Sequence, residues 1–239
     1  MLMEKSKTSV FKVIMTVVFA LLVFASFFYV IFGKFEADSK LKMEYFAYAC
    51  VVLCFLFSLC FIKMNFKKII LTLGLASVVA ADYFLTLMPT EQNKLIGVCI
   101  FCVFQFFLMT YTLYLNQSIG TRIFNIAFRV ALCLLAYFLI PNYFEIGTLE
   151  LVAVMYILNF AVSLIFLLIH IKSEWLLFLG CLLFFLCDIV VGLKNGGITL
   201  LNLSGPFVDF LNSGDIAFYL YIPGLFLIAT SSVYAKKKG

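Results

Sequence analysis

Residues 69–88 read IILTLGLASVVAADYFLTLM, an apolar stretch of about 20 residues with a single charged side chain, Asp82. A helix of this length crosses about 30 Å of hydrocarbon. A carboxylate near the centre of such a helix costs roughly 2.5 to 3.5 kcal/mol during membrane insertion. The stretch therefore predicts a membrane-spanning helix whose one acidic residue has a specific purpose.

The composition of the whole chain agrees with this interpretation. The 239 residues are 65% hydrophobic and only 12% charged, whereas soluble domains average about 45–50% apolar and about 25% charged residues. The net charge of +5 comes mostly from short lysine clusters at the ends of apolar runs, so it does not indicate a nucleic-acid partner. The sequence predicts an integral membrane protein surrounded by lipids.

Eight apolar runs are long enough to cross a bilayer. The predicted spans lie near residues 12–32, 44–62, 68–88, 95–115, 122–140, 147–170, 174–193 and 216–235. No linker or low-complexity segment separates them. We therefore expect an all-α fold in which residues 1–239 form a single bundle of about eight transmembrane helices.

The distribution of basic residues predicts the orientation of this bundle, because short cytoplasmic loops carry an excess of lysine and arginine. With an even number of spans both termini lie on one side. The basic residues on that side are Lys5, Lys7, Lys12, Lys63, Lys67, Lys68, Arg122, Lys172, Lys236, Lys237 and Lys238. Lysines on the other side are diluted by acidic residues, so both termini are predicted to be cytoplasmic.

A second intramembrane acid, Asp188, lies in the apolar run FFLCDIV of residues 184–190. Asp82 precedes Pro89 by seven residues and Asp188 precedes Lys194 by six, which places each about 10 Å from the outer end of its helix. If the two helices are neighbours, the acids share a cavity. Two carboxylates there do not both stay ionised at low cost, which leaves a proton donor beside a carboxylate. The alternative is that each acid only pins helices together.

Other polar residues within the spans are candidates to line the same cavity and bind a substrate. They are Gln105, Tyr156, Asn159, Tyr219 and Tyr221; each can instead form an ordinary hydrogen bond between helices. Arg129, one helical turn after Asn125, is a basic residue within a span. It either snorkels to the inner headgroups or binds a lipid phosphate.

The sequence gives little indication of a metal site. Cys99-x-x-Cys102 has no second pair of ligands, and all eight cysteines fall inside apolar runs, where they are typical of small packing residues. The single His170 lies at a predicted helix end and is interpreted as an interfacial residue. We expect no metal and no organic cofactor.

Four short motifs resemble those of the YhhN family of membrane proteins. Ala81-Asp82 is similar to the family's Gly-Asp on the third helix, and Gly180-x-x-x-Phe184-x-x-Cys187-Asp188 to its Gly-x-x-x-Phe-x-x-Ser-Asp on the seventh. Gly97-x-x-x-Phe101-x-x-x-Gln105 resembles a motif that ends in His. Tyr221-Ile-Pro-Gly-Leu225 resembles Tyr-Tyr-x-Ala-Gln, so here Gln105 replaces the His and Leu225 the Gln.

This resemblance implies a lysoplasmalogenase, which hydrolyses the vinyl ether bond of a lysoplasmalogen to a fatty aldehyde and a glycerophospho-headgroup. The substrate would be a lysophospholipid, and Asp82 and Asp188 would supply the acid and base. The alternative is a proton-coupled carrier or lipid-binding membrane protein that uses the same two acids. The Lys-, Ile- and Phe-rich composition and the lack of an appended domain favour a bacterial plasma membrane.

Overall fold

Each of the eight apolar runs forms a helix. The computed structural model describes residues 2–32, 39–61, 65–115, 118–194, 204–206, 208, 211 and 216–234. The long helices are α1 (Leu2–Phe32), α2 (Ser39–Cys60), α3 (Phe66–Asp82), α4 (Glu91–Tyr114), α5 (Ile119–Tyr143), α6 (Thr148–Ile169), α7 (Ile171–Gly192) and α10 (Ile216–Tyr234), and a π-helical segment η1 (Tyr83–Leu87) continues α3. These described parts contain no strand, so the all-helical prediction is confirmed.

Six of the described helices are long and apolar enough to cross a membrane: α3 with η1, α4, α5, α6, α7 and α10. The two N-terminal helices carry shorter apolar segments, Val10–Ala25 and Glu44–Cys60, within their described parts. Large apolar side chains also cover the outside of the bundle, as on α5, where Ile123, Phe124 and Phe138 are exposed. Such an exterior is compatible with a multi-pass integral membrane protein.

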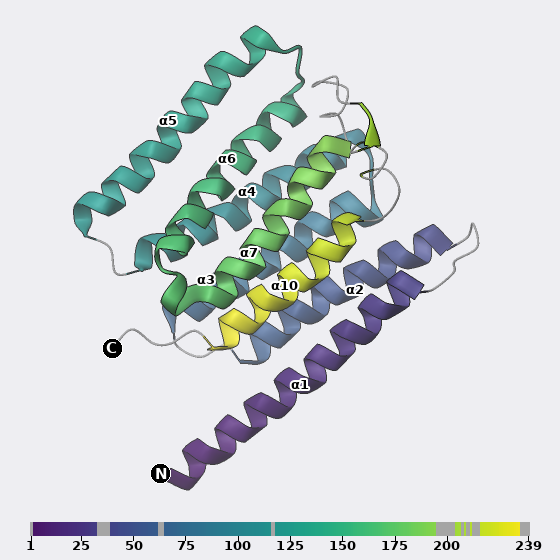
Figure 1. The fold of residues 1–239 in the computed structure, drawn as a ribbon, viewed down its shortest axis with the longest axis vertical. Helices are drawn as coiled ribbons and strands as arrows, with labels where there is room; N and C mark the ends of the chain where they lie inside the picture. The colour runs from purple at the N-terminus through teal and green to yellow at the C-terminus, as the bar shows by residue number, and fades with distance from the viewer. Residues whose placement is uncertain are drawn as a thin grey trace.

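The helices pack side by side in one bundle (Figure 1). α3 packs mainly on α4, and α7 mainly on α10, while α2 and α6 complete the centre. α1 lies at one edge against α2 and α10, and α5 lies at the other edge against α6. The predicted third and seventh spans thus both belong to the central group of helices.

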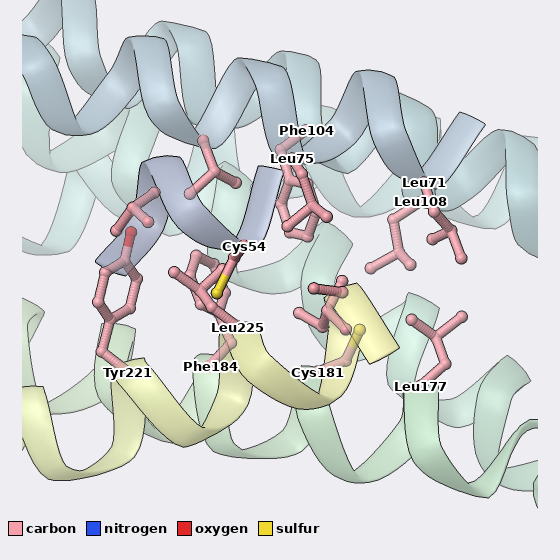
Figure 2. Close-up of a cluster of buried hydrophobic side chains, with 14 of the residues drawn as sticks. Cys54, Leu71, Leu75, Phe104, Leu108, Leu177, Cys181, Phe184, Tyr221 and Leu225 are labelled. Carbon is pink, nitrogen blue, oxygen red and sulfur yellow. The ribbon is translucent and has the colours of Figure 1, made fainter. Parts of the chain in front are cut away.

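The core is a continuous cluster of apolar side chains between the central helices. Figure 2 shows part of it, including Leu71, Leu75, Phe104, Leu108, Leu177, Cys181, Phe184, Tyr221 and Leu225. α7 and α10 approach closely at Gly180 and Gly224, where a Cβ atom on Gly180 would lie 2.9 Å from the Gly224 carbonyl oxygen. This close approach brings Tyr221 of α10 into the core.

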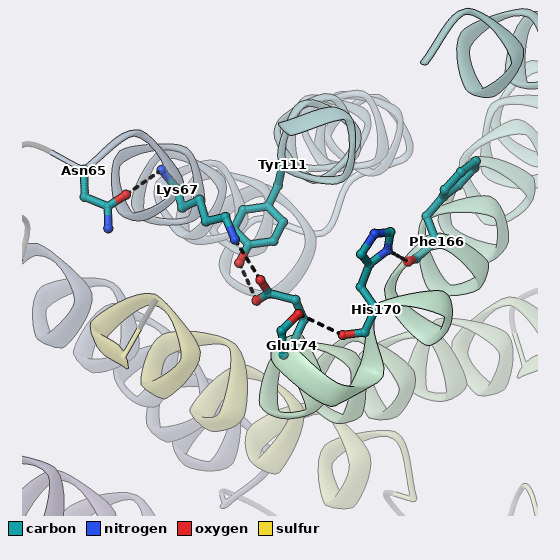
Figure 3. Close-up of polar contacts among 7 residues, drawn as sticks. Asn65, Lys67, Tyr111, Phe166, His170 and Glu174 are labelled. Carbon is teal, nitrogen blue, oxygen red and sulfur yellow. Dashed lines mark hydrogen bonds and ion pairs between the residues drawn. The ribbon is translucent and has the colours of Figure 1, made fainter. Parts of the chain in front are cut away.

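A polar cluster joins several helices at one end of the bundle (Figure 3). Lys67 Nζ lies 2.8 Å from Glu174 Oε1, and the Tyr111 hydroxyl donates a hydrogen bond of 2.6 Å to Glu174 Oε2. Glu174 has non-helical angles (φ −124°, ψ 25°), which kinks the first turn of α7. The starts of α3 and α7 and the end of α4 therefore meet at this end.

The lysines at the start of α3 differ from the sequence-based expectation of loop charges. Lys67 and Lys68 both lie in the first turn of the helix, and the Lys68 ammonium is buried and donates a hydrogen bond to the Val233 carbonyl. Thr16 of α1 also lies 3.1 Å from the Tyr234 hydroxyl, atom to atom. The last turn of α10 thus lies beside α1 and at the same end as the start of α3.

Candidate active site

Asp82 is the last residue of α3, at the point where the α-helix widens into η1. Single π-turns are rare and often accompany functional residues. Gly97 of α4 permits the turn, because a Cβ atom there would lie 2.5 Å from Cγ of Leu85 in η1. The Asp82 side chain is only 6% exposed, and its Oδ2 accepts a hydrogen bond from the Tyr221 hydroxyl of α10.

Asp188 has an equivalent partner. It lies on α7, one turn before the helix ends at Gly192, and its Oδ2 accepts a hydrogen bond of 2.5 Å from the Tyr156 hydroxyl of α6. In both pairs a phenol holds one carboxylate oxygen. The other oxygen, Oδ1, accepts no hydrogen bond from the described residues.

The two acid–tyrosine pairs belong to one site. Asp188 lies close enough to Asp82 to feel its charge, and the Cys187 thiol is within range of both. The Phe184 ring lies against Tyr221, with centroids 5.2 Å apart. α3, α6, α7 and α10 each contribute one side chain to the two pairs, so the site lies at their junction.

Gln105 adds an unsatisfied amide to this junction. It projects from α4, is 4% exposed, and lies beside the Tyr156 hydroxyl. Neither its Nε2 nor its Oε1 reaches hydrogen-bonding geometry with a described group. Buried polar atoms without partners are uncommon and costly, so they call for an explanation. A bound molecule or water that completes the hydrogen bonds of Gln105 is such an explanation.

Comparison of the chain with protein-family models, curated proteins and solved structures finds no match. Two carboxylates with unused acceptor oxygens, two phenols and one amide can together bind a polar molecule and move a proton. Among the described residues no three His, Cys, Asp or Glu side chains cluster to hold a metal ion.

The structure brings three of the other predicted site residues to Asp82 and Asp188 or to their partners, but not all of them. Tyr156, Tyr221 and Gln105 lie at the junction as expected. Tyr219 is 40% exposed on α10, although it is only two residues from Tyr221. A shift of two residues rotates a side chain by about 200° around a helix, which separates the two tyrosines.

Arg129 and Asn159 lie in a different cluster, between α5 and α6. The Arg129 guanidinium is 3% exposed and donates hydrogen bonds to Asn125 Oδ1 (2.7 Å), the Asn159 carbonyl (2.8 Å) and Ser163 Oγ (3.0 Å). The expectation that Arg129 snorkels is wrong, because these three acceptors hold it inside the bundle. The Asn159 side-chain amide also points toward α5 and donates a hydrogen bond to Cys133 Sγ at 2.9 Å.

Two neighbours of the acids were not predicted from the sequence. Cys187, interpreted only as a packing residue, lies within range of the charge of both carboxylates; its position next to Asp188 was the available signal. Tyr48 of α2 also lies within range of the Asp82 charge, with its ring 6.4 Å from that of Tyr83. No spacing in the sequence indicates that α2 approaches Asp82.

Proposed function

We propose that this chain is a membrane hydrolase that cleaves the vinyl ether bond of a lysoplasmalogen, with Asp82 and Asp188 as its acid and base. The observation that supports this most strongly is the meeting of two tyrosine-bound carboxylates at the junction of α3, α6, α7 and α10. The resemblance of the motifs around both acids to the YhhN family supplies the substrate class. We place the protein in a bacterial plasma membrane.

The reaction suits a pair of carboxyl groups. One, protonated, donates its proton to the enol-ether carbon that is not bonded to oxygen, which leaves an oxocarbenium ion. The other, ionised, stabilises that cation and accepts a proton from the water that attacks it. The hemiacetal formed then breaks its bond to the glycerol oxygen, giving the aldehyde and the alcohol. Glycosidases use two carboxyl groups for the same kind of intermediate.

The neighbouring groups have positioning roles in this proposal. Tyr156 and Tyr221 each hold one carboxylate oxygen and leave the other free toward the substrate. The Gln105 amide, which has an unpartnered donor and an unpartnered acceptor, binds the attacking water or an oxygen of the substrate. The aromatic wall around Phe184 excludes other water from the cation.

The test is release of fatty aldehyde from a lysoplasmalogen by the purified protein in detergent. Asp82→Asn and Asp188→Asn should each lower the rate by about 100- to 10,000-fold, the usual contribution of a general acid or base. Glu91→Gln, which changes an exposed carboxylate on α4, is the matched control and should keep the full rate. Full activity in either Asp variant would rule out the mechanism.

A proton-coupled carrier for a lipid is the second candidate. It is favoured by the parallel course of α3 and α7, whose starts meet at the contact of Lys67 with Glu174, since a parallel repeat of helices is common among carriers. In sealed vesicles with an internal pH dye, lysoplasmalogen should cause acidification without release of aldehyde if the chain is a carrier. Release of aldehyde in detergent contradicts this candidate.

A further inference from the structure

A groove of about 460 Å³ opens between α5 and α6, with Met109 of α4 at its edge. This volume lies within the roughly 300–1,000 Å³ of typical ligand sites. Its walls are apolar, formed by residues such as Ile126, Val130 and Leu134, and its polar lining includes Arg129 and Asn159. The groove therefore combines an apolar channel with a cation.

The cation in this groove has no counter-ion. All three acceptors of Arg129 are neutral groups, and no described carboxylate lies within ion-pair distance of it. Each terminal nitrogen of the guanidinium uses one N–H in these bonds and keeps a second one. A buried guanidinium with only neutral partners is costly, and arginine presents paired N–H groups that match a carboxylate.

Asn125 adds a second donor without an acceptor. Its side chain is fully buried, its Oδ1 accepts from Arg129 Nε, and its Nδ2 has no partner among the described residues. Unused N–H groups around Arg129 are thus present on its own terminal nitrogens and on Asn125. Donors and a positive charge together indicate an anionic ligand.

We propose that this groove binds a long-chain fatty acid, with its carboxylate on Arg129 and its alkyl chain along the apolar walls. The depth of Arg129 in the membrane favours a carboxylic acid over a phosphate as the ligand. Arg129 follows Ile119, the first residue of α5, by ten positions, so it lies about 15 Å from the helix end, near the middle of the hydrocarbon layer. A phosphate headgroup keeps its charge and stays at the surface, whereas a carboxylic acid enters the apolar layer in its neutral form.

This site is separate from the pair of acids. Asn159 lines the groove and bonds to Cys133 of α5, whereas Tyr156, offset from it by about 60° around α6, reaches Asp188 of α7. The proposal of a fatty-acid site therefore does not rest on the proposed hydrolase activity, and either proposal can be wrong while the other is right.

The test uses oleate as the probe and the full chain in detergent. Cys133 lines the groove, so oleate should slow its alkylation by N-ethylmaleimide at least about fivefold. Cys60, which is exposed on α2, is the control within the same sample and should react at an unchanged rate. Mass spectrometry of the peptides separates the two. Oleyl alcohol, with an equivalent chain but no carboxylate, should give no protection, and equal protection by it overturns the proposal.

Two variants test whether the carboxylate of oleate binds to Arg129. In Arg129→Gln oleate should no longer protect Cys133, whereas Arg122→Gln, which removes the same charge two turns away on the same helix, should leave protection intact. If Arg129→Gln does not fold, Leu134→Trp fills the groove without touching the guanidinium and should also abolish protection. Protection that survives in folded Arg129→Gln or Leu134→Trp, or stronger protection by lysophosphatidic acid than by oleate, contradicts the proposal.

Discussion

The hydroxyl of Tyr221 holds Asp82, and its removal tests whether this hydrogen bond matters for catalysis. A hydrogen bond to a charged group is worth about 1.5 to 3 kcal/mol, so Tyr221→Phe should lower the rate of aldehyde release by about 10- to 100-fold. Tyr219→Phe removes the same atom from an exposed tyrosine two residues away and should keep the rate. Equal rates for the two variants would show that Tyr221 is not a positioning residue.

Gln105 offers a test in which stability and activity should change in opposite directions. Its buried amide has no partner among the described residues, and an unsatisfied buried polar group costs about 1 to 3 kcal/mol. Gln105→Leu should therefore raise the midpoint of thermal unfolding in detergent while it lowers aldehyde release. A lower midpoint would mean that the amide stabilises the fold rather than serving a ligand.

The sequence predicted the two acids better than the residues around them. Asp82 and Asp188 stand out because a charged residue within an apolar span raises the free energy of membrane insertion, whichever neighbours its side of the helix meets. Asn159 was predicted to line the same cavity as Tyr156, yet Asn159 reaches α5 and Tyr156 reaches α7. Three residues correspond to an offset of about 60° around a helix, and only the positions of the neighbouring helices decide whether that offset matters.

At the scale of elements, all eight helices lie where the apolar runs predict them. Most ends shift by a few residues, but α1 begins at Leu2, ten residues before the predicted start. α5 continues past the expected end at residue 140 and includes Pro141. The Phe144 amide still donates to the Ile140 carbonyl, so the last turn closes around the proline. The π-turn after Asp82 was not predicted, because the apolar run gives no local signal for a widened turn; in the structure this turn brings Leu85 against Gly97.

The contact of α7 with α10 positions Tyr221, and it depends on two glycines. A Cβ atom on Gly180 would lie 2.9 Å from both the Gly224 carbonyl oxygen and the Ile228 backbone nitrogen, so Gly180→Ala must push the helices apart. Such overpacking costs about 1 to 3 kcal/mol. Thermal unfolding in detergent should show a lower midpoint, and aldehyde release should fall with it. Gly192→Ala, where nothing lies within 4 Å, is the control on the same helix and should change neither quantity.

For the whole molecule, hydrophobicity predicts that the helices form a bundle but not their neighbours. Most of the helices are apolar on several sides, so no polar stripe identifies the face that meets lipid. The observed order depends on particular contacts, such as Gly180 with Gly224 and Lys67 with Glu174. α5 illustrates the difficulty, because its buried Arg129 and Asn125 were the only sequence features that marked its inner face.

The orientation of the bundle can be tested with alkaline phosphatase, which is active only where its disulfides form, outside the cytoplasm. The hydrogen bond from Lys68 to the Val233 carbonyl places the end of α10 and the start of α3 at one end of the bundle. The basic residues clustered there predict that this end faces the cytoplasm. In bacterial cells a fusion after Gly239 should therefore be inactive, and a fusion after Thr90, beyond η1, should be active at equal expression. The reverse pattern would contradict the orientation, and equal activity at both positions would contradict the crossing of the membrane by α3.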